Sequence, residues 1–308
     1  MKRLIVAVLV AVLVLVLVAP AVLAKPDMSK PLPATDVELV KKATLHDKPA
    51  GGGKPAKQAA TGTLGANSSG NKYAIIVGIS DYPGEENDLQ YCDDDAQDIF
   101  NALTTLYGYN SSNIHLVLNM TASFDAIRNA ISDIESKAEA DDEVVFFFSG
   151  HGANGRFSGD DALDKLQGVD SNGVDEAIVC HDGSQNGQFM YIWDGQLRDW
   201  FAGFKTSRII FIFDSCLAGG MTDLKADGRV INMACSESGL SYEDGSWQNG
   251  QFTYYFVDQG MLAGEADTYD NIAGIADVTI EEAFDYAKAD CRMQKPTISD
   301  SFSNDLLL

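Results

Sequence analysis

Short, continuous apolar segments alternate along the chain with longer segments whose apolar residues recur at helical spacing. A segment that is apolar throughout indicates a strand buried on both faces, as in a parallel sheet covered by helices. The strands expected on this basis are 73–79, 114–118, 144–149, 177–180, 208–214 and 229–234. The expected helices are 95–107, 122–138, 193–203, 252–263 and 279–290. This alternation predicts a three-layer α/β domain with a mainly parallel sheet.

The first residues have a different pattern. A basic pair, Lys2 and Arg3, precedes an unbroken apolar run from Leu4 to Ala19. This is typical of a secretory signal peptide over residues 1–24, with an uncleaved membrane anchor as the alternative. We therefore expect an exported protein, secreted or held at the cell surface, which contacts a membrane only if this segment stays uncleaved.

Composition changes after residue 70. Residues 25–70 are rich in Pro, Gly, Ala and Lys without sustained periodicity, which indicates a linker or prosegment before a folded domain at 71–308. Residues 25–70 hold seven lysines against four acidic residues, whereas residues 71–308 hold thirteen basic residues against forty-one acidic ones. The net charge of −23 argues against nucleic acid and anionic membrane surfaces as partners.

Two of the expected strands end in potentially reactive side chains beside small residues. His151 lies between two glycines after "EVVFFFS", and Cys216 follows "RIIFIFDS". Sites in open α/β sheets form outside the carboxyl ends of the strands, so these side chains can meet if their strands are neighbours. A buried core cysteine and a loop histidine are the alternatives, but the two motifs together favour catalysis.

A thiol and an imidazole within reach of each other are suited to acyl transfer, most often peptide hydrolysis. The histidine accepts the proton of the thiol and later protonates the leaving amine. The backbone N–H groups of Gly152 and Cys216 would form the oxyanion hole.

The two motifs resemble those of the caspase–metacaspase superfamily of cysteine peptidases, which includes relatives of legumain and clostripain. "FFFSGHG" is similar to the histidine motif, and the Asp-Ser-Cys of "IFIFDSCLAGG" is closer to metacaspases than to caspases. "YAIIVGISDY" and "LQYCDDDAQDI" match the first strand and the segment after it. The resemblance covers roughly residues 72–300. It implies a caspase-like fold, Cys216 as nucleophile, His151 as base and acid, and chemistry that requires no cofactor.

The resemblance also implies which substrates are cut. Caspases select Asp through basic pocket residues, and no matching arginine is found here. Metacaspase pockets are acidic and accept Arg or Lys; by position the acids would be Asp95 and Asp214, with Ser149 lining the same pocket. Asp95 is alternatively a first-turn helix acid, with Asp93 and Asp94 as other registers. The expected partners are protein or peptide substrates with Arg or Lys at the cleaved bond.

An acidic stretch, residues 158–183, suggests a calcium site, since calcium needs several oxygen ligands on flexible backbone. Many metacaspases are calcium-activated through a loop in this region, and "VDEAIVCHDG" is similar to theirs. The candidate ligands are Asp160, Asp175 and Glu176. A solvated acidic surface loop is the alternative.

The lysines of residues 25–70 carry the charge that an acidic pocket would accept. They suggest a prosegment that masks the cleft or is cut by the enzyme itself, with a plain spacer as the alternative. For the domain as a whole, two other functions remain open. One is a transamidase or ligase on the same scaffold, and the other is a catalytically silent secreted binding domain.

Overall fold

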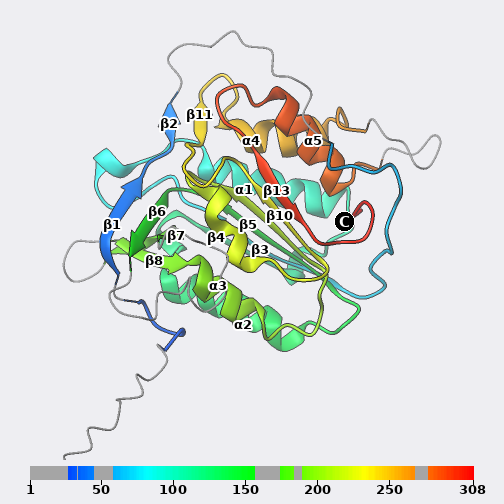
Figure 1. Ribbon diagram of the computed structural model, residues 1–308, viewed down its shortest axis with the longest axis horizontal. Helices are drawn as coiled ribbons and strands as arrows, with labels where there is room; N and C mark the ends of the chain where they lie inside the picture. Colours follow the sequence, from blue (N-terminus) through cyan, green and yellow to red (C-terminus); the bar gives the residue numbers. More distant parts are fainter. Residues whose placement is uncertain (1–26, 33, 45–57, 157–173, 184–188, 268–276) are drawn as a thin grey trace, which may run out of the picture.

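The computed structural model describes residues 27–32, 34–44, 58–156, 174–183, 189–267 and 277–308. The expected signal peptide and Asp160 lie outside these residues. A six-stranded sheet forms the centre of the molecule (Figure 1). Its strand order is β13 (Thr297–Asp300), β10 (Arg229–Met233), β9 (Ile209–Asp214), β5 (Glu143–Ser149), β3 (Lys72–Gly78) and β4 (Ile114–Leu118). All neighbours are parallel except β13 with β10, which confirms the mainly parallel sheet.

Helices cover both faces of this sheet (Figure 1). On one face Ile75, Val77, Phe146 and Phe148 pack with residues of α2 (Phe124–Lys137) and α3 (Asp194–Phe201). Alternate residues of the same strands point to the other face, because side chains along a strand alternate in direction. There they meet α1 (Cys92–Thr105), α5 (Ile280–Asp290) and the π-helix η6 (Tyr254–Leu262), which continues α4 (Gln251–Thr253). The three predicted layers are confirmed.

Most expected elements are found within a few residues of their predicted bounds. The first helix begins at Cys92, three residues before its predicted start at Asp95. The expected strand at 177–180 is part of a longer strand, β7 (Asp175–Gly183), which lies outside the central sheet. Short 3-10 helices complete the described connections: η1 (Glu85–Asn87), η2 (Ser111–Asn113), η3 (Asn119–Thr121) and η5 (Ala218–Leu224).

Two smaller sheets lie beyond the carboxyl ends of the central strands. One has the antiparallel order β1 (Thr35–Val40), β6 (Gly152–Arg156), β7, β8 (Phe189–Trp193). The other has the order β12 (Asn249–Gly250), β11 (Tyr242–Asp244), β2 (Ala43–Thr44). Strands β1 and β2, blue in Figure 1, belong to residues 25–70, where the sequence pattern predicted no strand.

No helix within the described residues combines the length and the hydropathy that a membrane span requires. The described cysteines are all buried and none forms a disulfide bond: Cys92, Cys180, Cys216, Cys235 and Cys291.

Buried charges join the amino-terminal ends of the central strands. Glu143 forms an ion pair with Arg208 and accepts a hydrogen bond of 2.7 Å from the Tyr109 hydroxyl. Arg208 also donates to the carbonyl oxygens of Ala66, at 2.7 Å, and Leu307, at 2.6 Å. A single guanidinium therefore links four distant parts of the chain.

We expect Arg208→Met to lower the free energy of unfolding by about 3–5 kcal/mol, because it leaves the Glu143 carboxylate buried without its counter-ion. Urea denaturation would measure this change. The matched control is Lys205→Met, since the Lys205–Glu139 pair is exposed and a loss below about 1 kcal/mol is expected there. Equal losses in both variants would contradict the assigned role of Arg208.

Candidate active site

The parallel pairing of β5 with β9 places the two expected reactive residues together. In this register Ser149 lies opposite Asp214, so His151 and Cys216 follow at equivalent positions just past the two strand ends. Both side chains are buried. The backbones are so close that a Cβ atom at Gly152 would lie 2.0 Å from the Cys216 carbonyl oxygen, which explains why glycine occupies this position.

Tyr82 and Asn87 fix the position of the His151 imidazole. Its ring packs on the Tyr82 ring with centroids 4.6 Å apart, and its backbone N–H donates to the Tyr82 hydroxyl at 3.0 Å. Its Nε2 lies 2.7 Å from the carbonyl oxygen of Asn87 and, facing an acceptor, must carry the proton. The basic nitrogen is therefore Nδ1, which has no hydrogen-bond partner among the described residues.

Burial keeps both reactive groups neutral in this state. It lowers the pKa of His151 to about 4, and the nearby positive charges of Lys41 and Lys42 act in the same direction. It also raises the pKa of the Cys216 thiol to about 11, although an N–H from Ser241, 3.2 Å from Sγ, partly offsets this. Thiol and imidazole are both uncharged, because neither ion is solvated here.

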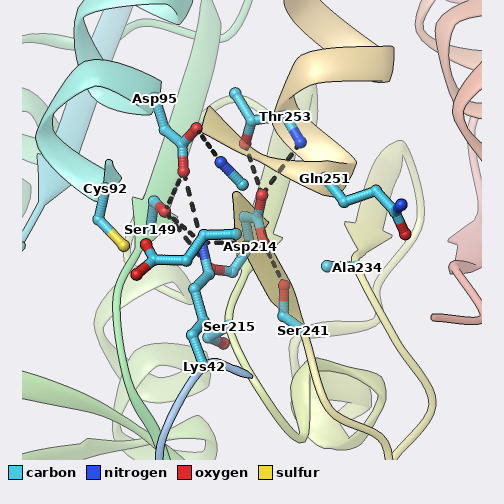
Figure 2. A network of polar contacts seen from close by, with 12 residues as sticks. Lys42, Cys92, Asp95, Ser149, Asp214, Ser215, Ala234, Ser241, Gln251 and Thr253 are labelled. Atoms are coloured by element: carbon cyan, nitrogen blue, oxygen red, sulfur yellow. Dashed lines mark hydrogen bonds and ion pairs between the residues drawn. The ribbon is translucent and has the colours of Figure 1, made fainter. Parts of the chain in front are cut away.

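An acidic pocket beside Cys216 encloses the side chain of Lys42 (Figure 2). The ammonium nitrogen lies 3.1 Å from Asp214 Oδ1, 3.4 Å from Asp95 Oδ2 and 2.8 Å from Ser149 Oγ. The side chains of Lys42, Asp95 and Asp214 are completely inaccessible to solvent. Each of the three residues expected to line an acidic pocket thus contacts the same buried cation.

Hydrogen bonds hold the Asp214 carboxylate in place. Asp214 accepts from Ser241 Oγ at 2.5 Å, Thr253 Oγ1 at 2.7 Å and Thr253 N–H at 3.0 Å. Donors fixed by the fold compensate this carboxylate for its lost hydration.

Asp95 is held in a similar way, by Ser149 Oγ at 2.6 Å and by Gly250 N–H at 2.8 Å. A Cβ at Gly250 would lie 2.4 Å from Asp214 Oδ2 and 2.8 Å from Lys42 Nζ, so the pocket requires glycine there.

The pKa values of the pocket groups reflect their burial. Burial raises the pKa of Asp95 to about 7, with a further contribution from the charge of Asp214. Burial by itself would lower the pKa of Lys42, but the negative charges around it, Asp214 foremost, raise this pKa well above its usual value. Among the three consecutive aspartates only Asp95 enters the pocket; Asp93 accepts hydrogen bonds from Ser80 and Asn119.

Residues 35–44, called the cleft segment below, pass directly over the nucleophile. Strand β1 pairs antiparallel with β6, Lys42 enters the pocket, and β2 pairs parallel with β11. Between the strands the Cys216 thiol donates to the carbonyl oxygen of Lys41 at 3.2 Å. The Lys41 side chain contacts the carbonyl oxygen of Glu86. The cleft segment therefore covers the thiol and fills the pocket at once.

A second group of buried acidic residues lies around the start of β7. Asp175 and Glu176, two of the expected calcium ligands, are buried at the start of this strand. Asp194 and Asp223 belong to the same cluster: burial raises the pKa of Asp194 well above its usual value, and the charges of the other three residues add to this. Arg198 pairs with Asp223 at 2.7 Å.

The described residues contain no group of three His, Cys, Asp or Glu side chains arranged as metal ligands. The third expected ligand, Asp160, lies outside the described residues.

Sequence patterns missed several residues of the site. Tyr82 lies in a loop and Asn87 ends the short helix η1. Only the "SDY" that resembles the family motif could have drawn attention to Tyr82. Ser241, Gly250 and Thr253 contact the pocket carboxylates from segments far along the chain, where nothing in the sequence marks them.

Two further cysteines, Cys92 and Cys235, are buried near the cleft. Cys92 begins α1, three residues before Asp95, and its pKa is raised by burial. Cys235 directs its sulfur to the Ser215 carbonyl oxygen at 3.3 Å. Both thiols belong to the same hydrophobic core cluster, which gives them a packing role.

Comparison with known proteins identifies the family. The model of the caspase domain, Peptidase_C14, matches residues 71–306. The chain belongs to this family of cysteine peptidases, as its histidine and cysteine motifs predicted.

Its curated relatives include metacaspases. Metacaspase-4 of Arabidopsis thaliana is 30% identical over 158 residues, which cover 49% of this chain and 34% of that protein. Metacaspase-1 of Saccharomyces cerevisiae is 29% identical over 165 residues, covering 51% of this chain and 35% of that protein. Metacaspase III c of Phaeodactylum tricornutum is 26% identical over 181 residues, covering 56% and 51%. The chain thus spans only 34% to 51% of the length of these relatives.

A solved structure shares the fold. The crystal structure of a Geobacter sulfurreducens protein superposes with a TM-score of 0.53 at 16% identity, covering 75% of this chain and 93% of that chain. At this identity the similarity concerns the fold alone.

The shifted pKa values lead to a test on the full chain. Because only the thiolate reacts, alkylation of Cys216 by iodoacetamide should be slow at neutral pH and should rise as pH increases toward about 11. Mass spectrometry of the modified peptide would give the rate, with Cys216→Ala as the blank. An alkylation midpoint at or below the ordinary thiol pKa of about 8.5 would contradict the neutral, covered state.

Proposed function

We propose that this protein is a cysteine endopeptidase that cleaves peptide bonds after Lys or Arg. The observation that carries the proposal is the Lys42 ammonium, buried between Asp95 and Asp214 beside Cys216. The long cationic side chain of a substrate would take the same place. The match with the caspase domain and the similarity to metacaspases support the peptidase chemistry.

In the proposed reaction His151 Nδ1 takes the proton of the Cys216 thiol as sulfur attacks the substrate carbonyl carbon. The N–H groups of Gly152 and Cys216 stabilise the negative oxygen that develops. The imidazolium then protonates the leaving amine, and water hydrolyses the thioester by the same route in reverse. Tyr82 and Asn87 act as positioning residues for the imidazole.

Two further parts of the proposal concern the state and location of the protein. The covering of Cys216 by the cleft segment supports a latent form, in which residues 25–70 act as a prosegment. The sequence of residues 1–24, with its basic pair and apolar run, supports export to the outside of the cell.

Hydrolysis of fluorogenic peptides that end in Lys, Arg or Asp would test the specificity. The full chain and its Lys42→Ala variant should cleave after Lys and Arg but not after Asp, and Cys216→Ala should be inactive. In the Lys42→Ala background, Asp214→Asn should reduce kcat/KM for the Lys peptide about ten- to hundredfold, as expected for a lost charged hydrogen bond. The exposed Asp81→Asn is the matched control. Cleavage after Asp alone would overturn the pocket assignment.

We also propose that calcium binds at the acidic cluster near β7. Its donors are carboxylate oxygens, which calcium prefers, and Asp194 Oδ2 and Asp223 Oδ1 are buried without a hydrogen-bond partner among the described residues. No three of the described side chains are arranged as metal ligands, so calcium binding would have to draw Asp175, Glu176 and the remaining expected ligand, Asp160, together with these oxygens. Bound calcium would supply positive charge to this cluster and neutralise its mutual repulsion.

Titration calorimetry should detect calcium binding to the full chain, and Asp175→Asn should weaken it at least about tenfold. The control is Asp199→Asn, because Asp199 contacts Arg198 from outside the cluster and is 43% exposed. Peptide hydrolysis with calcium and with a chelator would show whether binding activates. If the calcium-binding heats of Asp175→Asn and the parent were equal, calcium would not bind through Asp175, and the proposed site would be wrong.

A further inference from the structure

Hydrolysis after a pocket residue imposes a chain direction on the substrate. The thiol must reach the carbonyl carbon of the residue whose side chain fills the pocket, and the next residue must leave as the amine. The carbonyl oxygen must at the same time point to the oxyanion donors and away from the attacking sulfur.

The cleft segment meets neither requirement. The carbonyl group at Cys216 belongs to Lys41, which precedes the pocket residue, and its oxygen accepts a hydrogen bond from the thiol at 3.2 Å. The peptide group after Lys42 is held by a different contact, since the Ala43 N–H donates to the Ser241 carbonyl oxygen at 2.9 Å and the chain continues into β2. The chain therefore runs past the nucleophile in the direction opposite to that of a cleavable peptide.

Contacts before and after the cleft segment hold it in this direction. Before it, the carbonyl oxygen of Met28 accepts hydrogen bonds from Trp200 and Gln196, at 2.9 and 3.1 Å, and that of Ser29 accepts from Arg128 at 2.6 Å. Within it, β1 pairs with β6 along Glu38–Val40 and β2 pairs with β11.

The chain is held again further on. Backbone N–H groups of residues 59–63 donate to the carboxylates of Asp285 and Asp305 at 2.7–3.2 Å. Reversing the segment in the cleft would break the pairing of β1 with β6 and that of β2 with β11. The direction is therefore a property of the fold, set on both sides of the cleft.

We propose that the cleft segment is a built-in inhibitor that resists cleavage because it binds in reverse, so that the enzyme is activated when the segment is displaced rather than when the bond after Lys42 is cut. This inference rests on the proposed function and concerns the regulation of the same site. It differs from a prosegment that the enzyme removes by cutting in the cleft. Lys42 keeps the segment in place through its charge but never presents its carbonyl group to Cys216.

The test compares the full chain with Lys42→Ala, which removes the buried cation. The variant should alkylate at Cys216 at least about tenfold faster than the parent and should cleave the Lys peptide faster by a similar factor, since the pocket is then open. The active parent, incubated for a long time, should show no cleavage of the peptide bond after Lys41 or after Lys42 when its intact mass is measured.

Matched variants make the outcome specific. Lys30→Ala, which removes an exposed lysine from the preceding residues, should behave like the parent. Glu38→Pro leaves the pocket intact but breaks the pairing of β1 with β6. It should accelerate the alkylation of Cys216 and the cleavage of the Lys peptide as Lys42→Ala does. This variant keeps the test possible if Lys42→Ala does not fold.

Three results would be decisive. A cut after Lys41 or Lys42 in the parent that is absent from Cys216→Ala would overturn the inference. Unchanged alkylation in both Lys42→Ala and Glu38→Pro would also overturn it. If the two variants alkylate faster at Cys216 but hydrolyse no peptide, the proposed function is refuted. The segment would then be known only to cover Cys216.

Discussion

The parallel register of β5 and β9 is the constraint on which the rest of the site depends. Ser149 lies opposite Asp214 in this ladder, and both side chains reach the pocket. The residues two positions further on are His151 and Cys216, so one pairing supplies two pocket groups and both reactive groups. A shift of β9 by one residue would turn Asp214 to the opposite face of the sheet, and a shift of β5 would do the same to Ser149, so that the pocket would lose one of its groups.

Electrostatics explains why the pocket is filled. Two carboxylates enclosed without solvent repel each other and have lost their hydration. A cation between them is stabilising only if it lies within ion-pair distance of both, so that the attraction compensates for the lost hydration. Lys42 supplies that cation, while donors from Ser241, Thr253 and Gly250 satisfy the remaining carboxylate oxygens. The same enclosure keeps the thiol and the imidazole uncharged. The binding of the Lys42 ammonium and the neutral state of the Cys216 thiol thus have one physical cause, the exclusion of solvent.

The sequence predicted what depends on local pattern. Buried strands appear as apolar runs, and the reactive residues were found because they follow two of these runs directly. Strand β1 was missed although "TDVELV" alternates, with Val37 and Leu39 packing against the core, because the alternation is short and lies in a polar stretch. Asp194 and Asp223 were missed because only tertiary packing brings them to Asp175.

The cleft segment belongs to the chain that it covers, and this has a consequence for how the protein responds to concentration. Its occupancy is a unimolecular equilibrium, so dilution leaves the closed fraction unchanged, whereas a separate inhibitor would dissociate. A substrate competes with a constant internal ligand, and its apparent affinity is reduced by the fraction of open molecules. Under the proposed regulation, the fraction of open molecules therefore depends on the contacts of the cleft segment, Lys42 among them, and is independent of protein concentration.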